Sequence, residues 1–164
     1  MAITVLNNTV VAALNQASNP TSATLSNYTC GTGSNRVLIV TMGLMGSKDV
    51  TSISGVTYGG VSMTQAVAAL SGASSASVLS QIWYLLESDI PAGSNDVVVS
   101  LTSSIFTEMV IDALTVANVL QGPPETIASA TYPASSKSTT YSLNPVATTT
   151  GGLVIDNLAY SGVY

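Results

Sequence analysis

Short apolar runs alternate with clusters of glycine, serine, asparagine and proline along the whole chain. The runs recur at intervals of roughly 8 to 15 residues, a spacing typical of an all-β sandwich or barrel. The pattern predicts strands over Ile3–Leu6, Val10–Leu14, Ala23–Cys30, Arg36–Leu44, Val50–Tyr58, Val61–Leu70, Val78–Leu86, Val97–Leu101, Phe106–Val119, Thr140–Leu143 and Leu153–Tyr160. With no linker and no internal repeat, we expect one domain over residues 1–164, in which residues 1–20 are a candidate extended N-terminal arm.

The individual runs predict different positions in a sheet. Ala23–Cys30 alternates, which places Ala23, Leu25 and Asn27 on one face. Arg36–Leu44 is almost continuously apolar, as expected for a central strand that is covered on both faces.

Turn residues predict where the chain reverses. The pair Gly59-Gly60 lies between two alternating runs and indicates a hairpin, because glycine reaches positive φ without a Cβ clash. The small residues of Ser71–Ser77 predict an exposed loop, and Asp89–Asn95 has proline and glycine placed for a turn. Phe106–Val119 is long enough for a helix, but its β-branched residues and the lack of a cap favour a strand.

Charge is scarce in this chain. It has three basic and eight acidic residues, a net charge of -5, no histidine and one cysteine, while 46% of its residues are apolar. Without a cluster of cations we expect no binding to nucleic acid. No apolar run approaches the roughly 20 residues of a membrane-spanning helix, so we expect no membrane partner.

The beginning of the chain, MAITVLNN, has neither a basic n-region nor a long apolar h-region. Two explanations stay open: a signal was removed before the first residue, or the protein leaves the cell by another route, such as lysis of a virus-infected host. The lone Cys30 cannot form an internal disulfide, and we expect it to be a small buried hydrophobic residue.

Several motifs resemble those of a known module. They are GSNRVLIV at Gly33–Val40, VTSISGVTYGGVSMTQ at Val50–Gln65, IWYLL at Ile82–Leu86, PAGSNDVVVSL at Pro91–Leu101, and GGLV with Asp156 from Gly151 onward. This order resembles a β-sandwich module of bacterial surface proteins and of predicted phage and environmental virus structural proteins. The resemblance covers roughly Ala23–Gly162, and it implies an all-β, antiparallel two-sheet β-sandwich that is jelly-roll-like.

One departure from the module concerns the last motif. Similar modules continue beyond it with further strands, whereas this sequence stops at SGVY. A smaller core, a sequence that covers only an ordered part, and a strand supplied by a neighbouring subunit are all compatible with this difference.

Candidate catalytic groups are few. The absence of histidine excludes Ser-His-Asp and Cys-His chemistry. Lys48 and Lys137 could pair with serine, but both lie in serine- and threonine-rich turns, where a solvated lysine is expected.

Two carboxylate pairs could serve a glycosidase. Glu87 and Asp89 precede Pro91 in a predicted surface turn.

The second carboxylate pair is Glu108 and Asp112. Both residues lie at even spacing in a predicted strand, which places them on one face of it. An outward, solvent-facing row is the expected arrangement, and a buried acid pair is the alternative.

Binding sites are predicted no more strongly than catalytic ones. Without histidine, oxygen ligands suit Ca²⁺ better than zinc. The available carboxylates are Asp49, Glu87, Asp89, Asp96 and Asp156, but no calcium-binding motif is present.

A carbohydrate platform would need exposed aromatic faces. Trp83 is expected in the core, with Tyr84 on the opposite face of the same strand. Tyr28, Tyr58, Tyr132 and Tyr141 are dispersed along the sequence.

The sequence therefore assigns no catalytic, cofactor-binding or metal-ligating residue and no cofactor. The first hypothesis is a non-enzymatic structural subunit of an extracellular assembly, a virion surface or capsid-decoration protein. Its partners would be copies of itself and other structural subunits, contacted through Met1–Pro20 and Leu153–Tyr164. The alternative is a lectin-like or adhesive module that binds glycans and is secreted or displayed at the cell surface. A carboxylate-based glycosidase would require Glu108 or Asp112 to lie in a cleft.

Overall fold

Two antiparallel sheets make up the fold in the computed structural model, which describes residues 2–15, 21–46, 53–73, 76–102, 108–131 and 151–159. The elements are β1 (Thr4–Asn15), β2 (Ser22–Thr29), β3 (Val37–Gly46), β4 (Ile53–Tyr58), β5 (Val61–Ser62), β6 (Thr64–Ala73), β7 (Ala76–Leu86), the 3-10 helix η1 (Glu87–Asp89), β8 (Ser94–Leu101) and β9 (Glu108–Ala117). The predicted all-β, two-sheet sandwich is confirmed.

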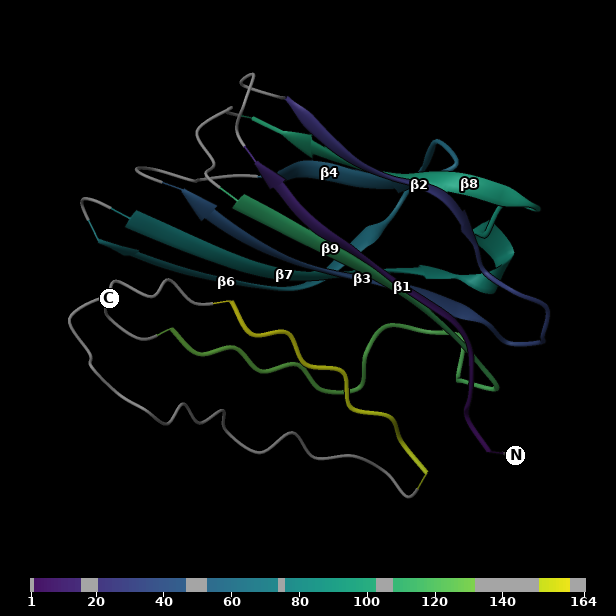
Figure 1. The fold of residues 1–164 in the computed structure, drawn as a ribbon. Coiled ribbons are helices and arrows are strands. Elements are labelled where there is room, and N and C mark those ends of the chain that lie inside the picture. The colour runs from purple at the N-terminus through teal and green to yellow at the C-terminus, as the bar shows by residue number, and fades with distance from the viewer. Residues whose placement is uncertain are drawn as a thin grey trace.

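The strand order is that of a jelly roll with one additional strand. One sheet has the order β1-β9-β3-β7-β6 and the other the order β2-β8-β4-β5 (Figure 1). The pairs β4·β5, β3·β7, β2·β8 and β1·β9 are nested in the sequence like one long hairpin, and successive pairs fall in alternate sheets. β6 lies outside this nesting and extends the five-stranded sheet beyond β7.

The core lies between the two sheets and is almost entirely apolar. β3 directs Leu38, Val40 and Met42 inward, and these side chains are at most 1% exposed. Burial of each such side chain stabilises the fold by roughly 1.5–3 kcal/mol. Cys30 and Trp83 are buried with them, as the sequence predicted.

A bulge in β2 corrects one predicted face. Strict alternation would place Asn27 inside and Tyr28 outside. Instead Asn27 adopts a φ of 60°, and the pairing with β8 shifts between Leu25 and Tyr28. The additional residue turns Tyr28 into the core, where it is 2% exposed.

The Gly59-Gly60 hairpin is confirmed, and both glycines have positive φ. The predicted single strand after it is wrong, because the chain changes sheets at Met63. Residues 61–62 pair with β4, whereas residues 64–73 pair with β7. Met63 donates its backbone N–H to the carbonyl of Val56 at 2.9 Å and buries its side chain between the sheets.

Two other expectations differ from the structure. The predicted loop Ser71–Ser77 is largely strand, because β6 runs to Ala73 and β7 begins at Ala76. The predicted strand Leu153–Tyr160 has no regular secondary structure as far as Ala159. In the candidate N-terminal arm, the predicted strands Ile3–Leu6 and Val10–Leu14 belong to one strand, β1, which pairs along β9. Residues 140–143 lie outside the described residues.

Candidate functional site

The outer face of the five-stranded sheet is covered by chain that comes after β9. Residues 119–131 and 151–159 run below the sheet in Figure 1, on the face opposite the second sheet. We call Gly151–Ala159 the covering segment. In the described part of the chain, no backbone–backbone hydrogen bond joins this segment to a strand.

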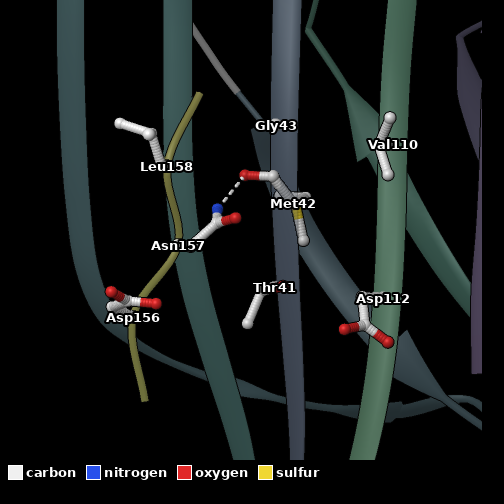
Figure 2. Close-up of a pocket in the computed structure, with 8 residues that line it drawn as sticks. All are labelled: Thr41, Met42, Gly43, Val110, Asp112, Asp156, Asn157 and Leu158. Carbon is white, nitrogen blue, oxygen red and sulfur yellow. Dashed lines mark hydrogen bonds between the residues drawn. The ribbon is translucent and has the colours of Figure 1, made fainter. Parts of the chain in front are cut away.

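Among the described residues, side-chain hydrogen bonds of Asn157 and Ser80 fix the covering segment to the sheet. Asn157 donates its Nδ2 hydrogens to the carbonyl of Met42 at 2.6 Å and to Ser80 Oγ at 2.9 Å (Figure 2). The Ser80 hydroxyl donates in return to the carbonyl of Asn157 at 3.1 Å. The segment also passes close to Gly43, where a Cβ would lie 3.3 Å from the Cβ of Ala159. A polar anchor with a small residue beside it therefore replaces the expected strand pairing.

A shallow hollow of about 270 Å³ lies over β3, between the covering segment on one side and β9 on the other. It is lined by Thr41, Met42, Gly43, Val110, Asp112, Asp156, Asn157 and Leu158 (Figure 2). Two carboxylates therefore share this site, one from β9 and one from the covering segment. Sequence spacing paired Asp112 with Glu108 instead, because the approach of residue 156 depends on the tertiary fold.

Asp112 is the chemically unusual residue of the hollow. Its Oδ1 is buried without a hydrogen-bond partner among the described residues. Desolvation raises the pKa of this carboxyl above its ordinary value, and a hydrogen bond from the backbone of Ala113 opposes the rise. Glu108 and Val110 are exposed on the same strand, so the expected outward row exists, but Asp112 is half-buried within it.

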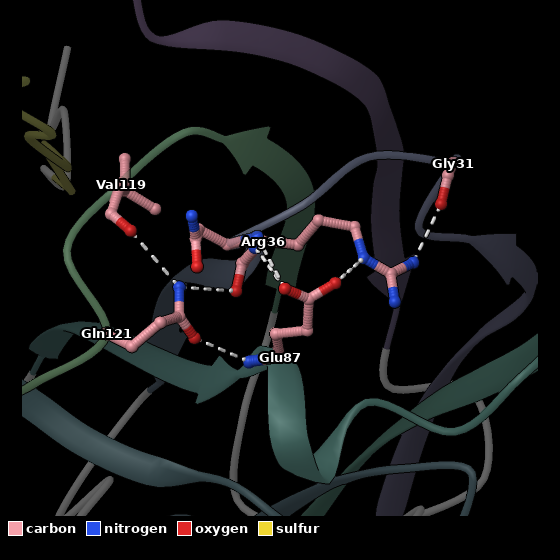
Figure 3. Close-up of polar contacts among 6 residues, drawn as sticks. Gly31, Arg36, Glu87, Val119 and Gln121 are labelled. Carbon is pink, nitrogen blue, oxygen red and sulfur yellow. Dashed lines mark hydrogen bonds and ion pairs between the residues drawn. The ribbon is translucent and has the colours of Figure 1, made fainter. Parts of the chain in front are cut away.

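Glu87, from the predicted carboxylate pair Glu87 and Asp89, takes part in a structural cluster of hydrogen bonds. Arg36 Nε donates to Glu87 Oε1 at 3.0 Å, and the backbone N–H groups of Asn35 and Arg36 donate to Glu87 Oε2 (Figure 3). The hydrogen bond from Arg36 lowers the pKa of Glu87 below its ordinary value. Gln121 accepts the backbone N–H of Glu87 at 2.9 Å and donates to the carbonyl of Arg36 at 3.2 Å. Glu87 therefore joins η1 to the chain segments that precede β3 and follow β9.

The remaining acidic residues that the structure describes do not come together in one site. Asp96 Oδ1 accepts the backbone N–H of Asn27 at 2.9 Å and so supports the β2 bulge. Among the residues that the structure describes, no three acidic or cysteine side chains lie close enough to hold a metal ion. Asp49, Lys48 and Lys137 lie outside the described residues.

The aromatic side chains belong mainly to the core. Trp83 is 8% exposed and donates its Nε1–H to Gln81 Oε1 at 2.8 Å. It forms part of a second shallow hollow of about 330 Å³ together with serine, threonine and methionine side chains. Tyr28 and Tyr58 are buried edge-to-face with their ring centroids 6.2 Å apart. Tyr132 and Tyr141 lie outside the described residues.

Apolar side chains are exposed on the covering chain. Leu120 is 80% exposed and Leu158 is 68% exposed, and Ile127, Leu153 and Val154 are exposed as well. Val110 is the exposed apolar side chain of the adjacent strand β9. The chain that covers the five-stranded sheet therefore presents apolar side chains to its surroundings.

No protein-family model matches this chain, and comparison with curated proteins and with solved structures likewise yields no match. The structure confirms the two-sheet sandwich that the resemblance of the motifs implied. The link of these motifs to bacterial surface and phage proteins stays a prediction. In the described ranges, no helix reaches the length and hydrophobicity that a membrane span requires.

Proposed function

We propose that this protein is a non-enzymatic structural subunit of an extracellular assembly, a virion surface or capsid-decoration protein, whose partners are copies of itself and other structural subunits. The observation that carries the proposal is the nature of the edges of the five-stranded sheet. Its edge strands β1 and β6 are 12 and 10 residues long, and neither contains a charged residue. Monomeric β proteins commonly protect long edges with charges or proline, because an open edge is a template for another strand.

The exposed apolar side chains support the same conclusion. Leu120, Leu153, Val154 and Leu158 are exposed on the chain that covers the five-stranded sheet. Exposed apolar side chains with few charges around them suit a surface that packs against another subunit.

The arrangement of the carboxylates supports a structural role over glycosidase chemistry. Asp112 and Asp156 share a shallow hollow, and among the described residues no ion pair holds Asp112 as a nucleophile. Glu108, the residue paired with Asp112 in sequence, is exposed outside the hollow. The lectin-like alternative needs an exposed ring face, whereas the Trp83 ring is buried and its N–H is already bonded.

The proposal is tested by the assembly state of the purified protein. Sedimentation velocity over a wide concentration range, with electron microscopy of the same samples, should show defined oligomers or an ordered array. A protein that stays monomeric at every concentration would contradict self-assembly. Immunogold labelling with antibodies against the chain tests the location, and the label is expected on particle surfaces. Label confined to cells would contradict the virion assignment.

A further inference from the structure

We infer that the free edge of β6 pairs with β6 of a second copy of this chain, related by a two-fold axis, so that two five-stranded sheets become one continuous sheet. This inference rests on the proposed function and names the surface through which assembly occurs. Strands related in this way are antiparallel, and the contact is closed because each copy contributes the same strand.

The free edge of β6 is open in the described part of the chain. β6 pairs with β7 on one side, and no backbone–backbone hydrogen bond reaches its other side. In an antiparallel pair, every second residue directs its N–H and C=O away from its partner. β6 therefore presents a row of unpaired backbone donors and acceptors.

The other three sheet edges are less suited to pairing. β5 is two residues long. β2 is bent by the bulge at Asn27, and the carbonyl of Thr29 at its end already accepts the side-chain amide of Asn7 at 2.6 Å. β1 supplies that Asn7 and has two register shifts of its own, which increase local twist and interrupt a regular edge.

β6 offers a regular stretch without any protective feature. After one shift at Ala66, its register with β7 is unbroken from Val67 to Ala73. The strand contains neither charge nor proline.

The distribution of charge favours a second copy as the occupant. The chain has a net charge of -5, so two copies carry charge of the same sign. β6 and its neighbour β7 are both free of charge, and the nearest acidic residue along the chain is Glu87, after the end of β7. An uncharged edge offers nothing to a strongly basic or acidic partner, but it meets an identical uncharged strand without like-charge repulsion.

The test compares two lysine substitutions on opposite edges of the same sheet. Ala68→Lys places two like charges at the proposed contact, and Thr9→Lys places the same charge on β1. Both native side chains are exposed, so both variants should retain the native circular dichroism spectrum. By sedimentation equilibrium, Ala68→Lys is expected to weaken dimerisation about tenfold or more, whereas Thr9→Lys leaves it unchanged.

Hydrogen exchange of the unmodified protein provides an independent measurement. Amides of Val67–Ala73 should gain protection as concentration rises through the dimerisation range, and amides of β1 should not. If the protein assembles but Ala68→Lys has no effect, or if Thr9→Lys is the disruptive variant, the inference is overturned and the proposed function stands. If the native protein does not assemble at all, both are overturned.

Discussion

The hydroxyls of Tyr28 and Thr115 lie 2.8 Å apart in the core and join the two sheets, because Tyr28 belongs to β2 and Thr115 to β9. Tyr28 also donates its hydroxyl hydrogen to the carbonyl of Asn7 at 3.2 Å. The Thr115 hydroxyl is therefore the donor toward Tyr28. This polar contact between apolar layers exists only because the β2 bulge turns Tyr28 inward.

A double-mutant cycle tests this contact between the sheets. Tyr28→Phe removes a partner of both Thr115 and Asn7 and should lower the free energy of unfolding by about 1–3 kcal/mol. Thr115→Val should lower the free energy of unfolding by a smaller amount, because the Tyr28 hydroxyl keeps its acceptor, the carbonyl of Asn7. Denaturant unfolding should show that the double variant loses less free energy of unfolding than the two single variants lose together. Strict additivity would contradict the coupling.

Alkaline pH should weaken the fold through two buried phenols. Burial raises the pKa of Tyr28 and of Tyr58 to about 12 from the ordinary 10.0. Below pH 10 both phenols are protonated in the folded and unfolded states, so they add no pH dependence. Between pH 10 and 12 the unfolded chain releases these protons first, so stability falls as pH rises.

Thermal unfolding from pH 8 to 12, with tyrosinate absorbance recorded in parallel, measures this effect. Tyr58→Phe removes one of the two phenols and should reduce the slope above pH 10. An equal slope in the variant would show that Tyr58 is not responsible.

Asn157→Asp should release the covering segment from the sheet. The substitution keeps the shape of the side chain but replaces its donor with an acceptor that faces the carbonyl of Met42. Leaving such acceptors unpaired costs roughly 1–3 kcal/mol locally. Hydrogen exchange should therefore become faster in Gly151–Ala159, while β3 and β7 keep their protection. Asn8→Asp adds the same charge at an exposed position and serves as the control, for which no change is expected.

Asp112→Asn should stabilise the protein at neutral pH. The carboxylate has a buried Oδ1 without a partner among the described residues, and desolvation raises its pKa. Its ionised form is therefore disfavoured in the folded state, and stability should rise as pH falls toward the raised pKa. The neutral amide should gain on the order of 1 kcal/mol at pH 7.

The matched control for Asp112→Asn is Glu108→Gln, which removes the same charge from an exposed position on the same strand. Thermal unfolding at pH 7 should show an increase in melting temperature for Asp112→Asn and none for Glu108→Gln. At a pH low enough to protonate both carboxyls, the advantage of Asp112→Asn should disappear. An equal gain in both variants would indicate a general effect of net charge.

The sequence by itself determined the class of fold and most of the strands. Alternation and β-branched residues predict β7, β8 and β9, and the continuous apolar run predicts the central position of β3 between β7 and β9. Gly59-Gly60 predicts its hairpin because both positions need positive φ. The burial of Trp83 follows from its place in an apolar run, and that of Cys30 from the usual burial of a free cysteine. These features depend on local conformation and on side-chain polarity, which a single chain segment already contains.

The tertiary structure alone decided which face Tyr28 occupies, where the chain changes sheets at Met63, and which carboxylates line the same hollow. A bulge shifts a two-residue period without an obvious change in composition, so alternation placed Asn27 inside. The hollow lined by both Asp112 and Asp156, and the anchoring of Asn157 on Met42 and Ser80, bring together residues far apart in the sequence. Such contacts depend on how the sheets pack and where the last segment crosses them, and no local preference determines either.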